Sequence, residues 1–142
     1  MNKLKVTIPG EPSGQGRPRF STRGGFVKAY DPEKSRNYKA FVKYIATHEA
    51  MKQGWVYTEE PIKMSVIAYM GIAKSKSKKF QQAALDGMER PTKKPDLSNI
   101  VKGVEDALNG LLYKDDSQIV ELKLQKFYSD EPRLEFSLEL AI

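Results

Sequence analysis

Three acidic side chains and one lysine in the second half of the chain are the residues best suited to chemistry. Asp96 precedes an amphipathic segment, Lys102 lies within that segment, and Asp115 and Asp116 follow it. Carboxylates hold Mg²⁺, the metal activates water and neutralises charge, and a lysine can steady a phosphate. These are the requirements of phosphodiester hydrolysis. Each acid also has an ordinary alternative, because Asp96 could cap a helix and the Asp pair could be turn residues.

Local spacing does not by itself bring these acids together. The helix predicted between them is roughly 20 Å long, at 1.5 Å of rise per residue. Asp96 meets Asp116 only if the following strand runs back past the helix N-terminus, or if a second subunit contributes one of them. Asp106 lies eight residues after Ser98, roughly 12 Å along the axis. Its natural partner is therefore Lys102, one turn away, which it could orient.

Hydrophobic patterning predicts the elements that position these residues. Apolar alternation predicts strands over residues 3–8, 62–70, 117–127 and 133–142. Helical spacing predicts helices from 31–32 to 54, over 78–86 and over 97–111. In the third strand the apolar face consists of Val120, Leu122 and Leu124. Residues 10–30 show no clear periodicity.

The order of these elements predicts an α+β fold. Alternation on one side of every strand means that one face of the sheet is packed and the other is wetter. We expect a two-layer sandwich of a mixed sheet of about four strands, with helices packed on one face. With 142 residues and no internal repeat, residues 1–142 are expected to form a single domain.

The composition restricts the kinds of metal site and of binding partner that the chain can have. The chain has no Cys and one His, so thiolate sites and sites with two imidazoles are excluded. It shows no long apolar run and no leader, so we expect a cytoplasmic protein without a membrane partner. The formal charge of +6, with a pI near 9.4, favours an anionic partner, most commonly nucleic acid.

Two basic segments could bind that nucleic acid. The first is Gly-rich, carries the aromatic residues Phe20, Phe26 and Tyr30, and contains Arg17, Arg19, Arg23 and Lys28. Such a segment can grip phosphates and stack on exposed bases, although a surface loop anchored by its aromatic residues is an equal alternative. The second leads up to Asp96 and contains Lys74, Lys76, Lys78, Lys79, Arg90, Lys93 and Lys94. Its alternative is an ordinary solvated face.

Several short motifs occur in a distinctive order. The chain reads Lys-Pro-Asp-Leu-Ser-Asn at 94–99, Asp-Ala-Leu-Asn-Gly at 106–110 and Tyr-Lys-Asp-Asp-Ser-Gln-Ile-Val at 113–120. Nearer the N-terminus it reads Gly-Arg-Pro-Arg-Phe at 16–20 and Ala-Tyr-Asp-Pro at 29–32. Together these motifs closely resemble the RusA family of Holliday-junction resolvases, and the last two resemble its phage and prophage branch. The similarity runs nearly end to end.

The resemblance implies a homodimeric endonuclease that uses Mg²⁺, or Mn²⁺ in its place, and no small-molecule cofactor. Such an enzyme binds four-way DNA junctions, makes paired nicks and serves DNA recombination and repair. The resemblance places metal ligands at Asp96, Ser98 and Asp116 and a catalytic lysine at Lys102. The family usually has Asp where this chain has Ser98. Ser98 could hold a metal-bound water, Asp115 could compensate, or the protein could bind junctions and cut poorly.

Three functions are therefore weighed. The leading one is a Mg²⁺-dependent Holliday-junction resolvase. The second is a catalytically weak or inactive junction-binding protein of the same fold, because of Ser98. The third is a basic RNA-binding module with no metal site. Mg²⁺-dependent nicking separates the first from the others, and preference for four-way junctions over RNA separates the second from the third.

Overall fold

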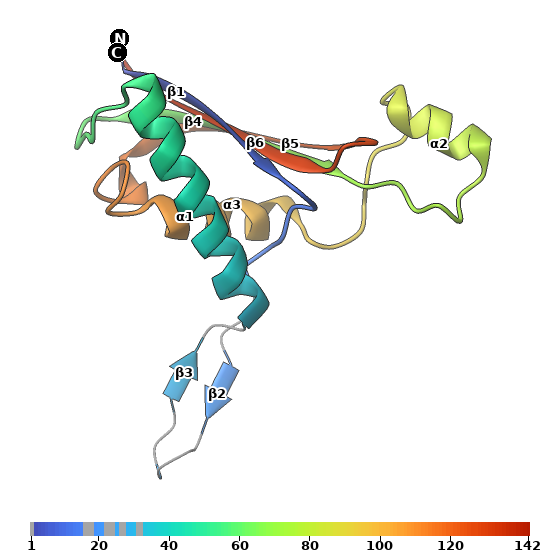
Figure 1. Cartoon of the computed structure of the whole chain (residues 1–142), viewed down its shortest axis with the longest axis horizontal. Coiled ribbons are helices and arrows are strands. Elements are labelled where there is room, and N and C mark those ends of the chain that lie inside the picture. Colours follow the sequence, from blue (N-terminus) through green and yellow to red (C-terminus); the bar gives the residue numbers. More distant parts are fainter. Residues whose placement is uncertain (1, 16–18, 22–24, 26–27, 31–32) are drawn as a thin grey trace.

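A four-stranded mixed sheet forms one layer of the protein (Figure 1). The computed structural model describes residues 2–15, 19–21, 25, 28–30 and 33–142, without the side chains of 19–21 and 28–30. The sheet has the order β1-β6-β4-β5. Its strands are β1 (Lys3–Pro9), β6 (Arg133–Leu140), β4 (Ile62–Met70) and β5 (Ile119–Tyr128). β6 is antiparallel to β1 and β4, whereas β5 is parallel to β4.

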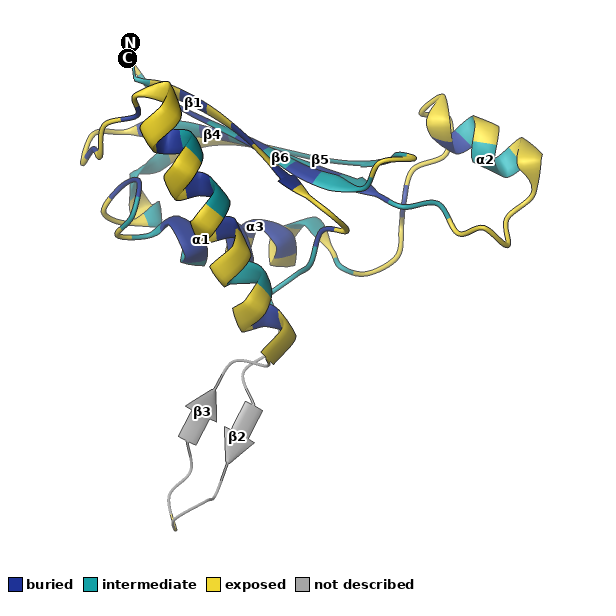
Figure 2. Cartoon of the chain, in the orientation of Figure 1, coloured by how far each residue is buried: buried dark blue, intermediate teal, exposed yellow. Residues whose placement is uncertain are grey.

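Two helices cover one face of this sheet. α1 (Glu33–Gln53) and α3 (Leu97–Leu108) lie on the same side, and α2 (Lys78–Leu85) projects beyond the end of the sheet (Figure 1). Alternate residues of β4 are buried from Ile62 to Met70, and they meet the buried faces of both helices in one core (Figure 2). The predicted two-layer α+β sandwich is confirmed. Among the described residues, no helix combines the length and the apolar character needed to cross a bilayer.

The aperiodic segment near the N-terminus contains a small hairpin that the sequence did not predict. β2 (Arg19–Ser21) pairs with β3 (Lys28–Tyr30) in a separate antiparallel sheet. Each strand has three residues, which is too short for an alternating pattern to be recognised.

Two element boundaries near Asp115 and Asp116 differ from the predicted ones. The predicted helix over 97–111 ends at Leu108, because Asn109 adopts ψ 129° and leaves the helix. The predicted strand over 117–127 begins at Ile119, after a short 3₁₀ helix, η2 (Asp116–Gln118). The chain therefore turns more tightly between α3 and β5 than the pattern indicated.

The apolar face predicted for β5 is only partly packed. Leu124 is half-buried, but Val120 is 62% exposed and Leu122 is 42% exposed. β5 is an edge strand whose single neighbour in the sheet is β4. Alternation shows which side chains share a face, but it does not show whether another element covers them.

Candidate active site on helix α3

Helix α3 has one buried face and one polar face. Its buried residues pack into the core and are Ile100, Val101, Gly103, Val104, Ala107 and Leu108. At 100° per residue the opposite arc carries Ser98, Asn99, Lys102, Glu105 and Asp106. We call these five residues the polar arc of α3. The first three are exposed and the two acids are half-buried.

Asp96 caps the N-terminus of α3. Its backbone is extended, with φ −79° and ψ 158°, and its Oδ1 accepts a hydrogen bond of 3.3 Å from the backbone N–H of Asn99. A carboxylate at this position satisfies a free N–H group and interacts favourably with the helix dipole. The cap also fixes an exposed carboxylate at the start of the polar arc, about 9 Å of helix rise before Lys102.

The chain that leads to the β2–β3 hairpin crosses the same end of α3. The backbone N–H of Gln15 donates to the carbonyl of Asn99 at 2.9 Å. A Cβ atom at Gly14 would lie 2.8 Å from Cβ of Pro95 and 3.2 Å from Cβ of Asn99, so a residue without a side chain permits this close approach. Gly14 and Gln15 therefore lie against the start of α3.

A tight turn leads the chain away from the end of α3. The N–H of Gly110, which has φ +75°, donates to the carbonyl of Tyr113 at 2.8 Å. The indole N–H of Trp55 donates to the carbonyl of Leu112 at 2.9 Å, and Tyr113 is fully buried. These contacts fix the turn that precedes Asp115 and Asp116.

Asp115 has a structural role as the cap of η2. Its carboxylate accepts from the N–H of Ser117 at 3.0 Å, and hydrogen bonding to Ser117 holds the pKa of Asp115 below its usual value. Its part as a substitute metal ligand stays a prediction.

Gln118 holds the same turn through hydrogen bonds of its side-chain amide. Its Oε1 accepts from the N–H groups of Lys114 at 2.8 Å and of Asp115 at 2.9 Å. Its Nε2 donates to the carbonyls of Thr58 and Glu60, both at 3.0 Å. Gln118 thus ties the turn that carries Asp116 to the segment leading into β4.

Lys102 is the cation of the polar arc, and several nearby carboxylates act on its charge. Its Nζ lies 3.5 Å from Oδ1 of Asp106, which confirms the predicted pairing of these two residues. The negative charge of Asp106, and next that of Asp116, raises the pKa of Lys102 above its ordinary value. Burial, and next the charge of Asp116, raises the pKa of Glu105. Lys102 therefore shares its surroundings with three carboxylates.

Sequence reasoning missed Glu105 as a member of this group. Glu105 follows Ser98 by seven residues, or two helical turns, so it lies on nearly the same side of α3. This spacing was the signal in the sequence that could have placed Glu105 in the polar arc.

The three predicted metal positions come from two parts of the chain. Ser98 and Asp96 lie at the start of α3, whereas Asp116 influences Lys102 and Glu105 further along. In the part of the chain that the structure describes, no three Asp, Glu, His or Cys residues are arranged to hold one metal ion. The metal set of Asp96, Ser98 and Asp116 stays a prediction.

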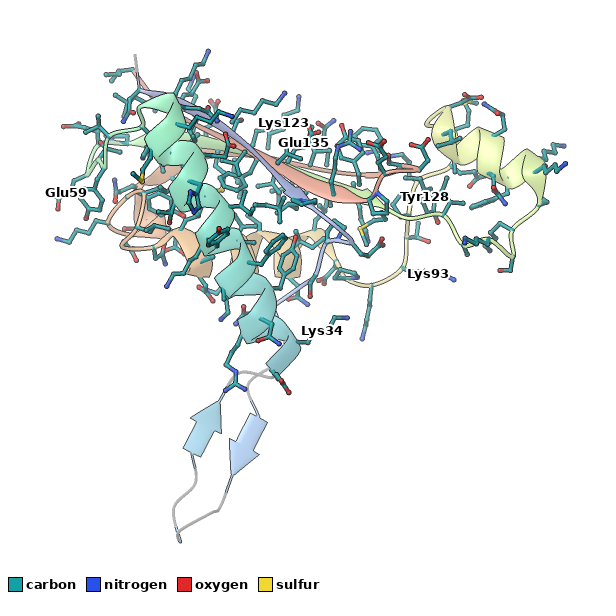
Figure 3. The ribbon with its side chains drawn as sticks, in the orientation of Figure 1. Lys34, Glu59, Lys93, Lys123, Tyr128 and Glu135 are labelled. Carbon is teal, nitrogen blue, oxygen red and sulfur yellow. The ribbon has the colours of Figure 1, made fainter. Side chains whose placement is uncertain are left out.

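The second basic segment forms an arm, residues 71–95, that carries α2 and returns to α3. Lys76, Lys78, Lys93 and Lys94 are all exposed. The arm is attached to the end of β5, where the ring of Phe80 meets that of Tyr128 at 5.8 Å and the guanidinium of Arg90 lies 3.8 Å above the ring of Phe127. Tyr128 marks this end of β5, and Lys93 lies on the return to α3 (Figure 3).

The first basic segment is described only in part. Arg17 and Arg23 lie outside the described residues. Arg19 belongs to β2 and Lys28 to β3, and their side chains are not described. Their predicted DNA contacts stay predictions.

Comparison with known proteins decides the family. The family model for Endodeoxyribonuclease RusA matches residues 9–139. The chain belongs to the RusA family. The match includes Asp96, Lys102, Asp116 and both basic segments, and it supports endodeoxyribonuclease activity on Holliday junctions in general. This RusA family member is also 48% identical over 137 residues to Uncharacterized protein YqaN of Bacillus subtilis (strain 168), covering 95% of this chain and 94% of that protein.

Proposed function

We propose that this RusA family protein is a homodimeric, Mg²⁺-dependent endonuclease that resolves four-way DNA junctions by paired nicks. The observation that carries the proposal is the ion pair of Lys102 with Asp106 on the exposed face of α3, where the charge of Asp116 also acts on the lysine. The arm with its exposed lysines ends at Lys94, two residues before Asp96, and the backbone N–H of Gln15 bonds to the carbonyl of Asn99 near the start of α3. A phosphate backbone can thus be bound close to the acids.

The chemistry of the acids suits a hard divalent cation. Asp116 raises the pKa of Glu105, which means that the two carboxylates repel each other. A cation would relieve this repulsion, and carboxylate oxygens are the ligands that Mg²⁺ prefers. We propose Asp96 and Asp116 as its ligands, Ser98 as a contact through water, and Glu105 as a neighbouring acid. When bound, Mg²⁺ would activate water and neutralise charge on the phosphate.

The remaining residues hold the substrate and the charges around it. The ammonium group of Lys102 contacts the scissile phosphate and stabilises the charge that develops there. Asp106 orients Lys102 through their ion pair. Lys76, Lys78, Lys93 and Lys94 bind the phosphates of the junction arms. Two such sites are required because paired nicks fall on opposed strands of a two-fold-symmetric junction.

Ser98 favours a second candidate, a protein that binds junctions and cuts them weakly. A hydroxyl replaces the carboxylate that the family usually has there, and fewer charged ligands weaken Mg²⁺ binding. Both candidates bind four-way junctions, so nicking distinguishes them.

Competition between nucleic acids tests the substrate. A labelled four-way junction is incubated with the protein and with unlabelled four-way junction, duplex of the same arm sequence or single-stranded RNA. We expect only unlabelled junction to compete at equimolar amounts. Equal competition by RNA would reject the proposed substrate and favour a basic RNA-binding module.

A further inference from the structure

The last part of the arm, residues 89–95, is bound to the end of β5 by two reciprocal hydrogen bonds. Nε of Arg90 donates to the backbone carbonyl of Lys126 at 2.7 Å, and Nζ of Lys126 donates to the backbone carbonyl of Lys93. We call residues 89–95 the return segment and this pair of bonds the clasp. Hydrogen bonds from charged donors of this kind are stronger than neutral ones.

The guanidinium group of Arg90 also stacks on an aromatic surface. Its central carbon lies 3.8 Å from the centre of the Phe127 ring. Phe127 is the cross-strand partner of Tyr69 on β4, and the two rings stack with their centres 6.1 Å apart. The guanidinium of Arg133, on β6, lies 3.9 Å above the ring of Tyr69. The platform beneath Arg90 is therefore held by three strands.

The clasp carries the return segment around the edge of the sheet. Neighbouring residues of a strand point to opposite faces, so Lys126 and Phe127 project from different sides of β5. Lys126 shares its side with Leu124, which packs against the core. The chain passes from Arg90, above Phe127, to Lys93, beside Lys126, and then continues to α3 (Figure 1). Both faces of the edge strand thus hold the return segment.

Only two residues separate the clasp from the N-terminal cap of α3. The carbonyl of Lys93 is bound by Lys126, and the carboxylate of Asp96 is bonded to the backbone of its own helix. Residues 94–95 therefore connect two fixed points and can span at most about 7 Å. A stretch this short transmits a displacement of Lys93 to its neighbours. The positions of Lys94 and Asp96 thus depend on the clasp.

We propose that Arg90 and Lys126 are positioning residues for junction cleavage and act through the clasp, not by contact with DNA. They fix the return segment so that Lys94 presents its charge beside Asp96. The consequence for nicking rests on the proposed function, in which Asp96 binds Mg²⁺ and Lys94 binds a phosphate. Misplacement of reacting groups by about 1 Å can lower a rate by roughly 100-fold. Loss of the clasp should therefore affect the nicking rate more than the affinity for the junction.

The contrasting possibility is that the two cations bind phosphates of the DNA. The Nε–H of Arg90 already binds Lys126, and one face of its guanidinium lies on Phe127. The half-buried Lys126 is directed at Lys93. Lysine at position 90 would keep the charge but lose both the Nε–H and the planar group that stacks. A phosphate contact tolerates Arg90→Lys, whereas the clasp does not.

Single-turnover nicking and equilibrium binding of a four-way junction separate these two roles. With saturating enzyme and Mg²⁺, Arg90→Lys and Lys126→Met should each lower the nicking rate about tenfold. The Kd for the junction should change by less than about threefold. Lys123→Met is the matched control, because it removes one charge from an exposed lysine of the same strand and should alter neither quantity. The double variant should be no slower than the slower single variant, since both changes break one clasp.

Amide hydrogen exchange gives a readout that does not require cleavage. Exchange in residues 92–100 should become roughly fivefold faster in Arg90→Lys and in Lys126→Met. It should stay unchanged in Lys123→Met. Thermal unfolding and the fraction of active enzyme are recorded on the same samples, so that a change in folding is separated from a change in rate.

The outcomes distinguish this inference from the proposed function. Arg90→Lys that nicks at the wild-type rate, or a loss confined to the Kd, would overturn the positioning role and leave junction cleavage standing. A lower active fraction with an unchanged single-turnover rate would reveal only a contribution to folding and would also overturn it. A wild-type protein that never nicks would reject the proposed function, and with it any role of the clasp in cleavage.

Discussion

Nζ of Lys102 lies 3.5 Å from Oδ1 of Asp106, one turn further along the exposed face of α3. Asp106 is the main cause that raises the pKa of Lys102, and Asp116, from a different element, is the next. The lysine is thus held charged by one acid of its own helix and by one acid from the turn that follows. This relationship links the local geometry of α3 to the chemistry proposed for it.

Removal of Asp106 should lower the pKa of Lys102 toward its ordinary value of 10.5. In the wild type the raised pKa stabilises the folded state below pH 10.5, and this contribution is lost as the pH rises through the raised value. We expect Asp106→Asn to shift the ¹³Cε NMR titration of Lys102 to lower pH. At neutral pH nicking should fall by no more than about fivefold, because an exposed ion pair contributes little. An unchanged titration would show that Asp106 does not control Lys102.

Asp115 and Asp116 are adjacent but should respond differently to loss of charge. Asn retains the oxygen that caps η2, so Asp115→Asn should preserve the fold and most of the nicking activity. Asp116→Asn removes a proposed metal ligand and should lower nicking by about 100-fold or more. Nicking assays and thermal unfolding of both variants measure this contrast. The assignment would be reversed if Asp115→Asn were the more severe change.

Ser98→Asp should lower the Mg²⁺ concentration needed for half-maximal nicking. A carboxylate restored at this position adds a charged ligand, and the effect should be on the order of tenfold. Ser98→Asn, which adds size without charge, is the control. Mn²⁺ binding followed by electron paramagnetic resonance gives a readout that does not depend on cleavage. Wild-type protein that is saturated at low Mg²⁺, with no gain in Ser98→Asp, would contradict a weakened site.

Junction binding should depend steeply on salt if the arm contacts phosphates. Replacement of Lys76 and Lys78 by Gln should reduce the slope of log K against log salt by roughly 0.9 for each lost contact. Lys43→Gln and Lys52→Gln alter exposed lysines of α1 and should leave the slope nearly unchanged. Filter binding or fluorescence anisotropy over a salt series measures it. A nearly flat wild-type response would exclude phosphate contacts as the source of affinity.

The sequence was sufficient to predict features that depend on neighbouring residues or on a strand that is packed on alternate residues. β4 was predicted at its observed ends, 62 and 70, because a central strand that is packed on alternate residues shows strict alternation. The start of α3 was also predicted, since Asp96 is an N-cap that acts through its immediate neighbours. The pairing of Lys102 with Asp106 followed from helix geometry in the same way.

Sequence reasoning was insufficient where tertiary structure decides the outcome. Val120 and Leu122 read as packed residues, yet the position of β5 at the sheet edge leaves them exposed. The contribution of Asp116 to the surroundings of Lys102 depends on the turn held by Trp55 and Gln118. Bonds from Gln118 to a segment about sixty residues away leave no periodic signal in a single sequence.

The most direct test of the central claim is strand-specific nicking of a four-way junction by the wild type and by Lys102→Ala. Each strand is labelled in turn, and the reaction is run with Mg²⁺ and with EDTA. We expect the wild type to nick two opposed strands only when Mg²⁺ is present. Lys102→Ala should bind the junction and lose about 100-fold or more in rate. Wild-type nicking in EDTA, or full activity of Lys102→Ala, would contradict a metal-dependent site centred on this lysine.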